Sequence, residues 1–231
     1  MAHYMKWPEI YCKIGPDVRV EAHKYFEVEA ISHIYLLPNQ EKKNYLGQPL
    51  TREYYCFEFK ERSTGNFGSF LCGYDIAEHW LELSGQDAVP IFNPLSQHNR
   101  GGVNGGGPGP GAGGRVQNFD PIMKRLWNAL SMYIALADIT SSTNKAFGIL
   151  RTLERNLENP PALMNIRAVN TLFYKALTLA GDPNYANYTD YVAYKTRTLG
   201  ANLRVIQVND FNQAITANVH KDPTKRFPPS F

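Results

Sequence analysis

The chain has 231 residues, 43% of them hydrophobic and 19% charged, a composition that is typical of globular proteins and excludes an intrinsically disordered chain. No apolar run approaches the ~20 residues that cross a bilayer, and the first ten residues lack the hydrophobic stretch of a secretory signal, so we expect a cytoplasmic protein without membrane association. Residues 1–99 hold nine Lys or Arg and thirteen Asp or Glu (net −4), whereas residues 118–231 hold thirteen and eight (net +5), which predicts that the second half attracts polyanions.

The first half of the chain predicts a small β-rich α+β domain, residues 1–97. In residues 18–37, β-branched and aromatic residues alternate with polar ones, which favours two extended segments. Residues 54–61 (YYCFEFKE) are the strongest predicted strand, with alternate side chains on opposite faces. A helix is predicted between Asp75, as its N-cap, and Gly85, as its end. These elements predict a mostly antiparallel sheet with one helix packed against it.

The strand at residues 54–61 carries the first candidate for chemistry, Glu58 and Lys60. An acidic residue two positions before a lysine on a strand, with Glu27 and Glu29 upstream, resembles in outline the site of restriction-like nucleases, which use carboxylates for Mg²⁺ and a lysine near the attacking water. The competing interpretation is a solvated strand face on which these charges form cross-strand ion pairs.

Cys56, Cys72 and His79, with Cys12 as a fourth residue, are candidates for a zinc site or for a cysteine nucleophile with a histidine base. Structural zinc sites usually take their ligands from close pairs such as CxxC, and the chain has no such pair. Three widely spaced cysteines also do not fit a disulfide framework. We therefore predict reduced, structural cysteines, no metal and no cofactor.

Residues 98–117 predict a flexible linker between two folded domains. Residues 101–114 (GGVNGGGPGPGAGG) contain nine glycines and no side chain large enough to pack in a core. Glycine loses more backbone entropy on ordering than any other residue, so this composition opposes a fixed conformation. A phosphate-binding loop would need a strand before it and a helix after it, and that context is missing.

The second half predicts an all-α helical bundle, residues 118–220, followed by a disordered tail, residues 221–231. Helix starts are predicted at or near Asp120, Ser142, Ala162 and Asp210. Asp120-Pro121 is the clearest of these signals, because aspartate caps a helix and proline suits its first turn.

A row of tyrosines at every third residue lies between the predicted third and last helices, at positions 185, 188, 191 and 194. Aromatic rings interleaved with cations are typical of single-stranded nucleic-acid surfaces, where rings stack on bases and cations hold the backbone. The predicted nucleic-acid-binding residues are Tyr188, Tyr191, Tyr194, Lys195, Arg197, Arg204, Lys124, Arg125, Arg151 and Arg155. The alternative is that the tyrosines pack against the bundle or form a contact between copies of the chain.

The leading hypothesis is a non-enzymatic, cytoplasmic protein whose basic helical domain binds single-stranded nucleic acid or a protein partner. A metal-dependent nuclease centred on Glu58 and Lys60 is one alternative. A structural or assembly protein that forms homo-oligomers through the tyrosine row and the tail is the other.

Overall fold

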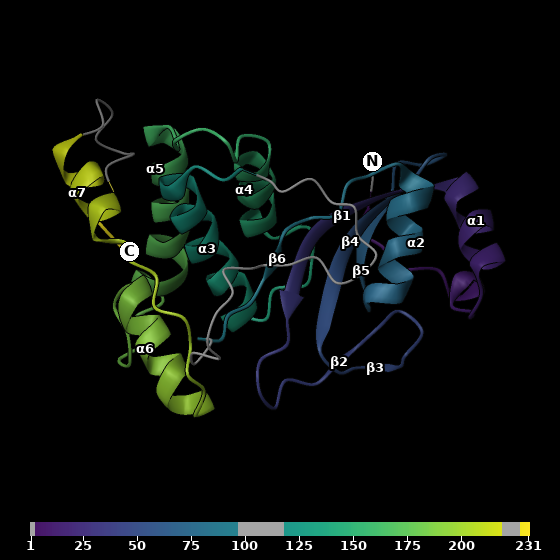
Figure 1. Ribbon diagram of the computed structural model, residues 1–231, viewed down its shortest axis with the longest axis horizontal. Helices are drawn as coiled ribbons and strands as arrows, with labels where there is room; N and C mark the ends of the chain where they lie inside the picture. The colour runs from purple at the N-terminus through teal and green to yellow at the C-terminus, as the bar shows by residue number, and fades with distance from the viewer. Residues whose placement is uncertain (1–2, 97–117, 219–226) are drawn as a thin grey trace. The chain divides into compact units, whose positions relative to one another are not determined.

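The computed structural model describes residues 3–96, 118–218 and 227–231 (Figure 1). Its fold belongs to the predicted α+β class, with a four-stranded sheet and helices followed by a helical C-terminal region. Two compact units make it up. The sheet unit consists of residues 3–93 and Ile139–Phe147, and the helical unit of residues 94–96, 118–138, 148–218 and 227–231. The predicted glycine-rich linker, residues 98–117, lies outside the described residues.

The sheet unit is built on strands with the order β5-β4-β1-β6. Their bounds are β1 (Phe26–Tyr35), β4 (Glu53–Glu61), β5 (Phe67–Cys72) and β6 (Ile91–Phe92), and a separate two-stranded ladder joins β2 (Lys42–Lys43) to β3 (Pro49–Leu50). β4 runs antiparallel to both β1 and β5, whereas the short β6 pairs with β1 in parallel. The predicted, mostly antiparallel sheet is therefore confirmed.

Two helices accompany the sheet, α1 (Pro16–Tyr25) and α2 (Tyr74–Ser84), and a short 3-10 turn covers Glu9–Tyr11. The extended segment predicted from residue 18 is wrong in its first part, which is helix α1. Pro16 occupies the first turn, Asp17 is an acidic residue near the helix N-terminus, and basic residues lie in the last turn. These charges complement the helix dipole and outweigh the apolar alternation that suggested a strand.

Aromatic side chains form the core between α2 and the sheet. Trp7 lies at its centre, with ring centroids 4.7 Å from Phe70, 5.0 Å from Phe59 and 5.6 Å from Trp80. Helix α2 ends at Gly85, which adopts a left-handed conformation as predicted (φ 61°). Its N-cap is Gly73 rather than the predicted Asp75, which lies in the first turn.

The opposite face of β4 is buried at Tyr54 and Cys56 and exposed at Lys60, and Ile139–Phe147 contributes to its contacts. The Cys56 thiol donates to the Thr140 carbonyl (3.4 Å), and the Ser69 hydroxyl donates to the same oxygen (3.0 Å). The backbone N–H of Ser142 in turn donates to the Ser69 hydroxyl oxygen (3.3 Å). Residues 139–147 were expected in the helical domain, but they cluster with the sheet unit.

The second region is helical, as predicted. Its elements are α3 (Pro121–Leu136), α4 (Lys145–Glu154), α5 (Leu163–Phe173), a π-helical turn (Tyr174–Thr178), α6 (Tyr188–Leu199) and α7 (Asn209–Ala217). The Asp120 side chain caps α3 by accepting from the N–H groups of Ile122 and Met123, both at 2.9 Å. Asp210 does not cap α7, because Val208 occupies that position and Asp210 lies in the first turn.

Residues 227–231 were expected to belong to a disordered tail, and instead they pack against the helical unit. Phe231 is buried, with its ring 5.1 Å from Phe211 and 5.4 Å from Phe173. The remainder of the predicted tail, residues 221–226, lies outside the described residues.

Candidate functional site

Helix α6 carries most of the predicted tyrosine row. It begins after Asn187, whose side chain accepts from the Asp190 N–H, and ends at Gly200 in a left-handed conformation. Tyr188 and Tyr191 face inward, with only 2% and 4% of their surface exposed. Burial raises the pKa of both phenols.

The burial of these two rings corrects part of the predicted nucleic-acid site. The Tyr188 ring stacks on Phe173 (4.7 Å), and the Tyr191 ring lies 6.1 Å from Tyr133 on α3. Both tyrosine rings are packed inside the helical unit, and neither offers a face on which a base could stack. A spacing of three residues is close to the helical repeat, so consecutive members of the row lie about 60° apart around the helix, and only neighbouring members such as Tyr188 and Tyr191 share its inner side.

Tyr185 and Tyr194 are the half-buried members of the row. Their ring centroids lie 5.7 Å apart, and the Tyr185 ring also meets Tyr191 at 4.9 Å. The Lys195 ammonium nitrogen lies 5.5 Å from the Tyr191 ring centroid, and Arg197 on the same helix is exposed. We refer to Tyr185, Tyr194, Lys195 and Arg197 as the α6 cluster. It combines two partly accessible rings with two cations on neighbouring turns.

The other predicted cations do not join the α6 cluster in one group. Tyr191 meets α3 at Tyr133, whereas Lys124 precedes Tyr133 by nine residues, about 13 Å along the helix axis at 1.5 Å per residue. Lys124 is exposed and lies over the Phe119 ring, and Arg155 beyond the end of α4 is exposed. Lys124 therefore lies along α3 at a distance from the point where α6 packs against it.

Three further predicted cations are partly buried in the helical unit. Arg125 forms an ion pair with Asp210 (2.5 Å), and its guanidinium carbon lies 5.7 Å from the Phe211 ring centroid. Arg151 is half-buried on α4, and Arg204 follows α6 with its backbone N–H donating to the Pro94 carbonyl (2.8 Å). Arg125 thus joins α3 to α7, which is a structural contribution that its position in the sequence did not reveal.

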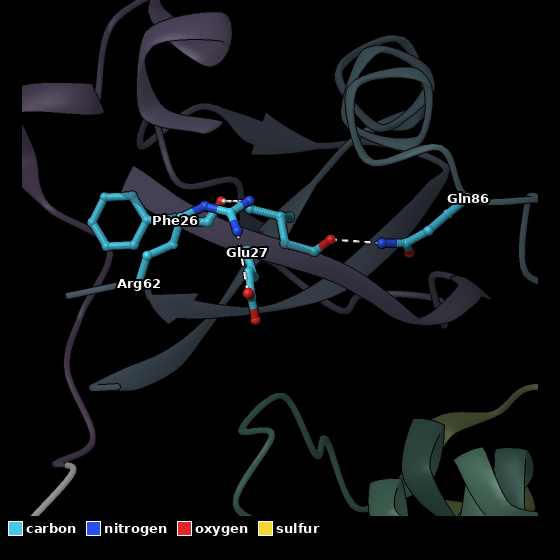
Figure 2. Close-up of polar contacts among 5 residues, drawn as sticks. Phe26, Glu27, Arg62 and Gln86 are labelled. Carbon is cyan, nitrogen blue, oxygen red and sulfur yellow. Dashed lines mark hydrogen bonds and ion pairs between the residues drawn. The ribbon is translucent and has the colours of Figure 1, made fainter. Parts of the chain in front are cut away.

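The register of the sheet brings the predicted carboxylates together. Glu29 on β1 is paired with Glu58 on β4, and Glu27 is paired with Lys60. Directly paired residues of antiparallel strands have their Cβ atoms about 5 Å apart on one face. Glu27 also forms an ion pair with Arg62 at 3.1 Å (Figure 2). The four charges predicted from spacing therefore share one sheet face, as both the nuclease hypothesis and the ion-pair interpretation require.

Cys56, Cys72 and His79 do not converge. Cys72 is paired with Tyr55 and Cys56 with Leu71, so the two thiols project from opposite faces of the sheet. Burial raises the pKa of the Cys72 thiol well above its ordinary value, which disfavours the thiolate that a nucleophile or a zinc ligand needs. His79 instead accepts a hydrogen bond at Nδ1 from the Arg19 guanidinium (2.7 Å) and links α2 to α1.

Among residues 3–96, 118–218 and 227–231, no group of three or more His, Cys, Asp or Glu side chains is placed to hold a metal ion. Within this described part of the chain, no helix is both long and apolar enough to cross a membrane. No protein-family model matches the chain, and no similarity to a curated protein or to a solved structure is found.

Proposed function

We propose that this chain is a non-enzymatic, cytoplasmic binding protein whose helical unit contacts single-stranded nucleic acid through the α6 cluster. The observation that carries the proposal is the grouping of Tyr185 and Tyr194, both half-buried, with Lys195 and Arg197. Rings of this kind stack on bases of any sequence, and neighbouring cations bind the phosphates.

The distribution of charge supports the same partner. The net charge is +5 over residues 118–231 and −4 over residues 1–99, so a polyanion is attracted to the helical half of the chain and repelled by the other. The exposed side chains of Lys124 and Arg155 provide further phosphate contacts in the helical unit. Because Lys195 and Arg197 are adjacent to the rings, the α6 cluster supplies stacking and charge at one place, whereas the other cations supply charge alone.

Binding of a fluorescent oligothymidylate, measured by anisotropy over a range of salt concentrations, tests the proposal. We expect affinity that falls linearly on a plot of log K against log salt, because phosphate contacts release counterions. Tyr194→Ala should weaken binding about tenfold or more, whereas Tyr194→Phe should bind like the unmodified chain, because the stacking face is retained.

A matched pair of charge variants separates a local contact from a general effect of net charge. Arg197→Gln and Lys60→Gln each remove one positive charge, the first from the α6 cluster and the second from an exposed position of β4. Arg197→Gln should weaken binding and reduce the salt slope by about one, and Lys60→Gln should change neither. Equal effects of the two substitutions, or binding that is independent of salt, would refute the proposal.

The other two hypotheses stay predictions. The nuclease hypothesis is located at the Glu29–Glu58 pair, and a cleavage assay with Mg²⁺ or Mn²⁺ on the unmodified chain and on Glu58→Ala tests it. The assembly hypothesis relied on the tyrosine row and the tail, but Tyr188, Tyr191 and Phe231 are used by packing within the helical unit. Light scattering over a concentration series tests it.

A further inference from the structure

Residues 227–231 (FPPSF) lie against the helical unit as a short peptide. Phe231 is 3% exposed and packs between Phe173 and Phe211. Phe227 lies against the Tyr174 ring (5.2 Å), with the Lys175 ammonium nitrogen 5.5 Å from its centroid. The two prolines restrict the backbone between the aromatic residues to extended conformations. One aromatic anchor therefore stands at each end of a stiff spacer.

Two asparagine side chains hold the backbone of this segment. Asn170 on α5 accepts from the Ser230 N–H at Oδ1 (2.8 Å) and donates from Nδ2 to the Pro228 carbonyl (3.0 Å). Asn212 on α7 accepts from the Phe231 N–H (3.2 Å) and donates to the Phe231 carbonyl (3.3 Å). The Ser230 carbonyl accepts from the N–H of Tyr188, the first residue of α6 (2.9 Å).

Asn170 occupies a position at which an apolar residue would be expected. It is 2% exposed and lies on the inner face of α5, beside Val169 and one turn before Phe173. A buried amide that lacks its hydrogen bonds costs about 1–3 kcal/mol. Both polar atoms of Asn170 are satisfied by the main chain of the segment, so this position of α5 is suited to a peptide backbone rather than to a purely apolar neighbour.

The same contacts define what the site recognises. Prolines 228 and 229 have no N–H, and the two N–H groups that follow, those of Ser230 and Phe231, are each bound by an asparagine oxygen. The Ser230 hydroxyl donates to the Pro228 carbonyl within the segment. Recognition thus depends on the backbone and on the two aromatic side chains, which is a general mode of peptide binding.

We propose that α5, the start of α6 and α7 form a peptide-binding site with Asn170 and Asn212 as a two-amide clamp, and that its ligand is an extended segment with aromatic residues on both sides of Pro-Pro-Ser. Residues 227–231 occupy the site within the chain. A partner protein that carries a segment of this chemistry competes with them for the clamp. Because a tethered ligand acts at an effective concentration near the millimolar range, the internal segment keeps weak competitors out.

The test uses the full-length chain with Phe231→Ala, which weakens the internal ligand, and a synthetic FPPSF peptide with a fluorophore at its N-terminus. Anisotropy should show peptide binding to Phe231→Ala that is at least tenfold tighter than to the unmodified chain. A peptide with alanine at its last position should not bind. Adding Asn170→Asp to Phe231→Ala should weaken binding at least tenfold, because the carboxylate cannot donate to the Pro228 carbonyl.

Two results would overturn the proposal: a folded Phe231→Ala chain, as judged by circular dichroism, that does not bind the peptide, or binding that Asn170→Asp leaves unchanged. If Phe231→Ala does not fold, Phe227→Ala replaces it as the acceptor chain, since it removes the other aromatic side chain of the internal ligand and leaves Asn170 and Asn212 in place. Dimers of the unmodified chain that the free peptide dissociates would assign the site to the segment of a second copy and contradict a partner protein.

Discussion

The side-chain amide of Gln86 hydrogen-bonds β1 in the way that a neighbouring strand would. Its Oε1 accepts from the Ala30 N–H (3.0 Å), and its Nε2 donates to the carbonyl of Val28 (2.6 Å), as Figure 2 shows for the second bond. The β6 strand pairs with β1 at His33 and Ile34, and within the part of the chain that the structure describes no strand pairs with the first half of that edge of β1. Gln86 satisfies two of its backbone groups.

Loss of this amide should therefore destabilise the sheet unit. We expect Gln86→Ala to lower the free energy of unfolding by about 1–3 kcal/mol, because each hydrogen bond contributes about 0.5–1.5 kcal/mol. Urea unfolding followed by circular dichroism measures the change. Gln213→Ala, at an exposed position of α7, is the matched control and should stay within about 0.5 kcal/mol of the unmodified chain. Equal stability of the two variants would contradict the role of Gln86.

A buried histidine should make the sheet unit sensitive to acid. His33 is buried in β1 with its ring stacked 3.9 Å from that of Tyr55, and burial lowers its pKa from 6.5 to about 3. The pKa of His33 is lower in the folded chain than in the unfolded chain, so between pH 6.5 and pH 3 the unfolded chain binds more protons. The free energy of unfolding therefore decreases as the pH is lowered from 6.5 towards 3. The slope from this group is at most about 1.4 kcal/mol per pH unit.

Urea unfolding between pH 4 and pH 7.5 checks this expectation. His33→Gln should flatten the dependence on pH over this range, because the glutamine does not titrate. His23→Gln, at a partly exposed position of α1, should leave the slope unchanged. An unaltered slope in His33→Gln would show that another group causes the loss of stability in acid.

Two glycines should respond in opposite directions to alanine. A Cβ atom at Gly68 on β5 would overlap the Met5 carbonyl oxygen and lie 2.6 Å from Cζ of Phe59. Gly68→Ala should therefore destabilise the chain by about 1–3 kcal/mol. Gly148 on α4 has no atom within 4 Å of such a Cβ, and Gly148→Ala should stabilise the chain by about 0.5–1 kcal/mol. Thermal unfolding of both variants tests the pair, and a shift of the same sign in both would refute it.

The three thiols should differ in their rates of alkylation. Cys56 and Cys72 are fully buried, whereas Cys12 is partly exposed near the N-terminus. Iodoacetamide should modify Cys12 first in the folded protein and all three residues at similar rates in urea. Peptide mass spectrometry after timed quenching identifies the sites. Early modification of Cys72 in the folded chain would contradict its burial.

The parts of the fold that could be predicted from sequence are those with local signals. Asp120 before Pro121 predicted the start of α3, and Gly85 predicted the end of α2. Helix α1 could not be predicted in this way, because the alternation of valines around Arg19 indicates a strand whereas Pro16 and Asp17 indicate a helix start. A strand period and a helix-start signal compete in so short a segment, and tertiary packing decides between them.

The candidate site was harder to predict because its decisive contacts are distant in sequence. A periodic tyrosine row cannot show which members face inward, since that depends on Phe173 and Tyr133 in other helices. The docking of this segment depends on Asn170, 60 positions before the Ser230 that it binds, and no feature of FPPSF itself distinguishes it from an unstructured tail. By contrast, the face shared by Glu58 and Lys60 followed from strand alternation alone.

The contact between Thr140 and the sheet has a consequence for folding during synthesis. Its carbonyl accepts hydrogen bonds from Cys56 and Ser69, which precede it by 84 and 71 residues. During synthesis at about 5–20 residues per second, β1, β4 and β5 emerge from the ribosome several seconds before Thr140. Until these contacts form, one face of the nascent sheet is incompletely covered. Chaperones that bind nascent chains would bind this face during that interval.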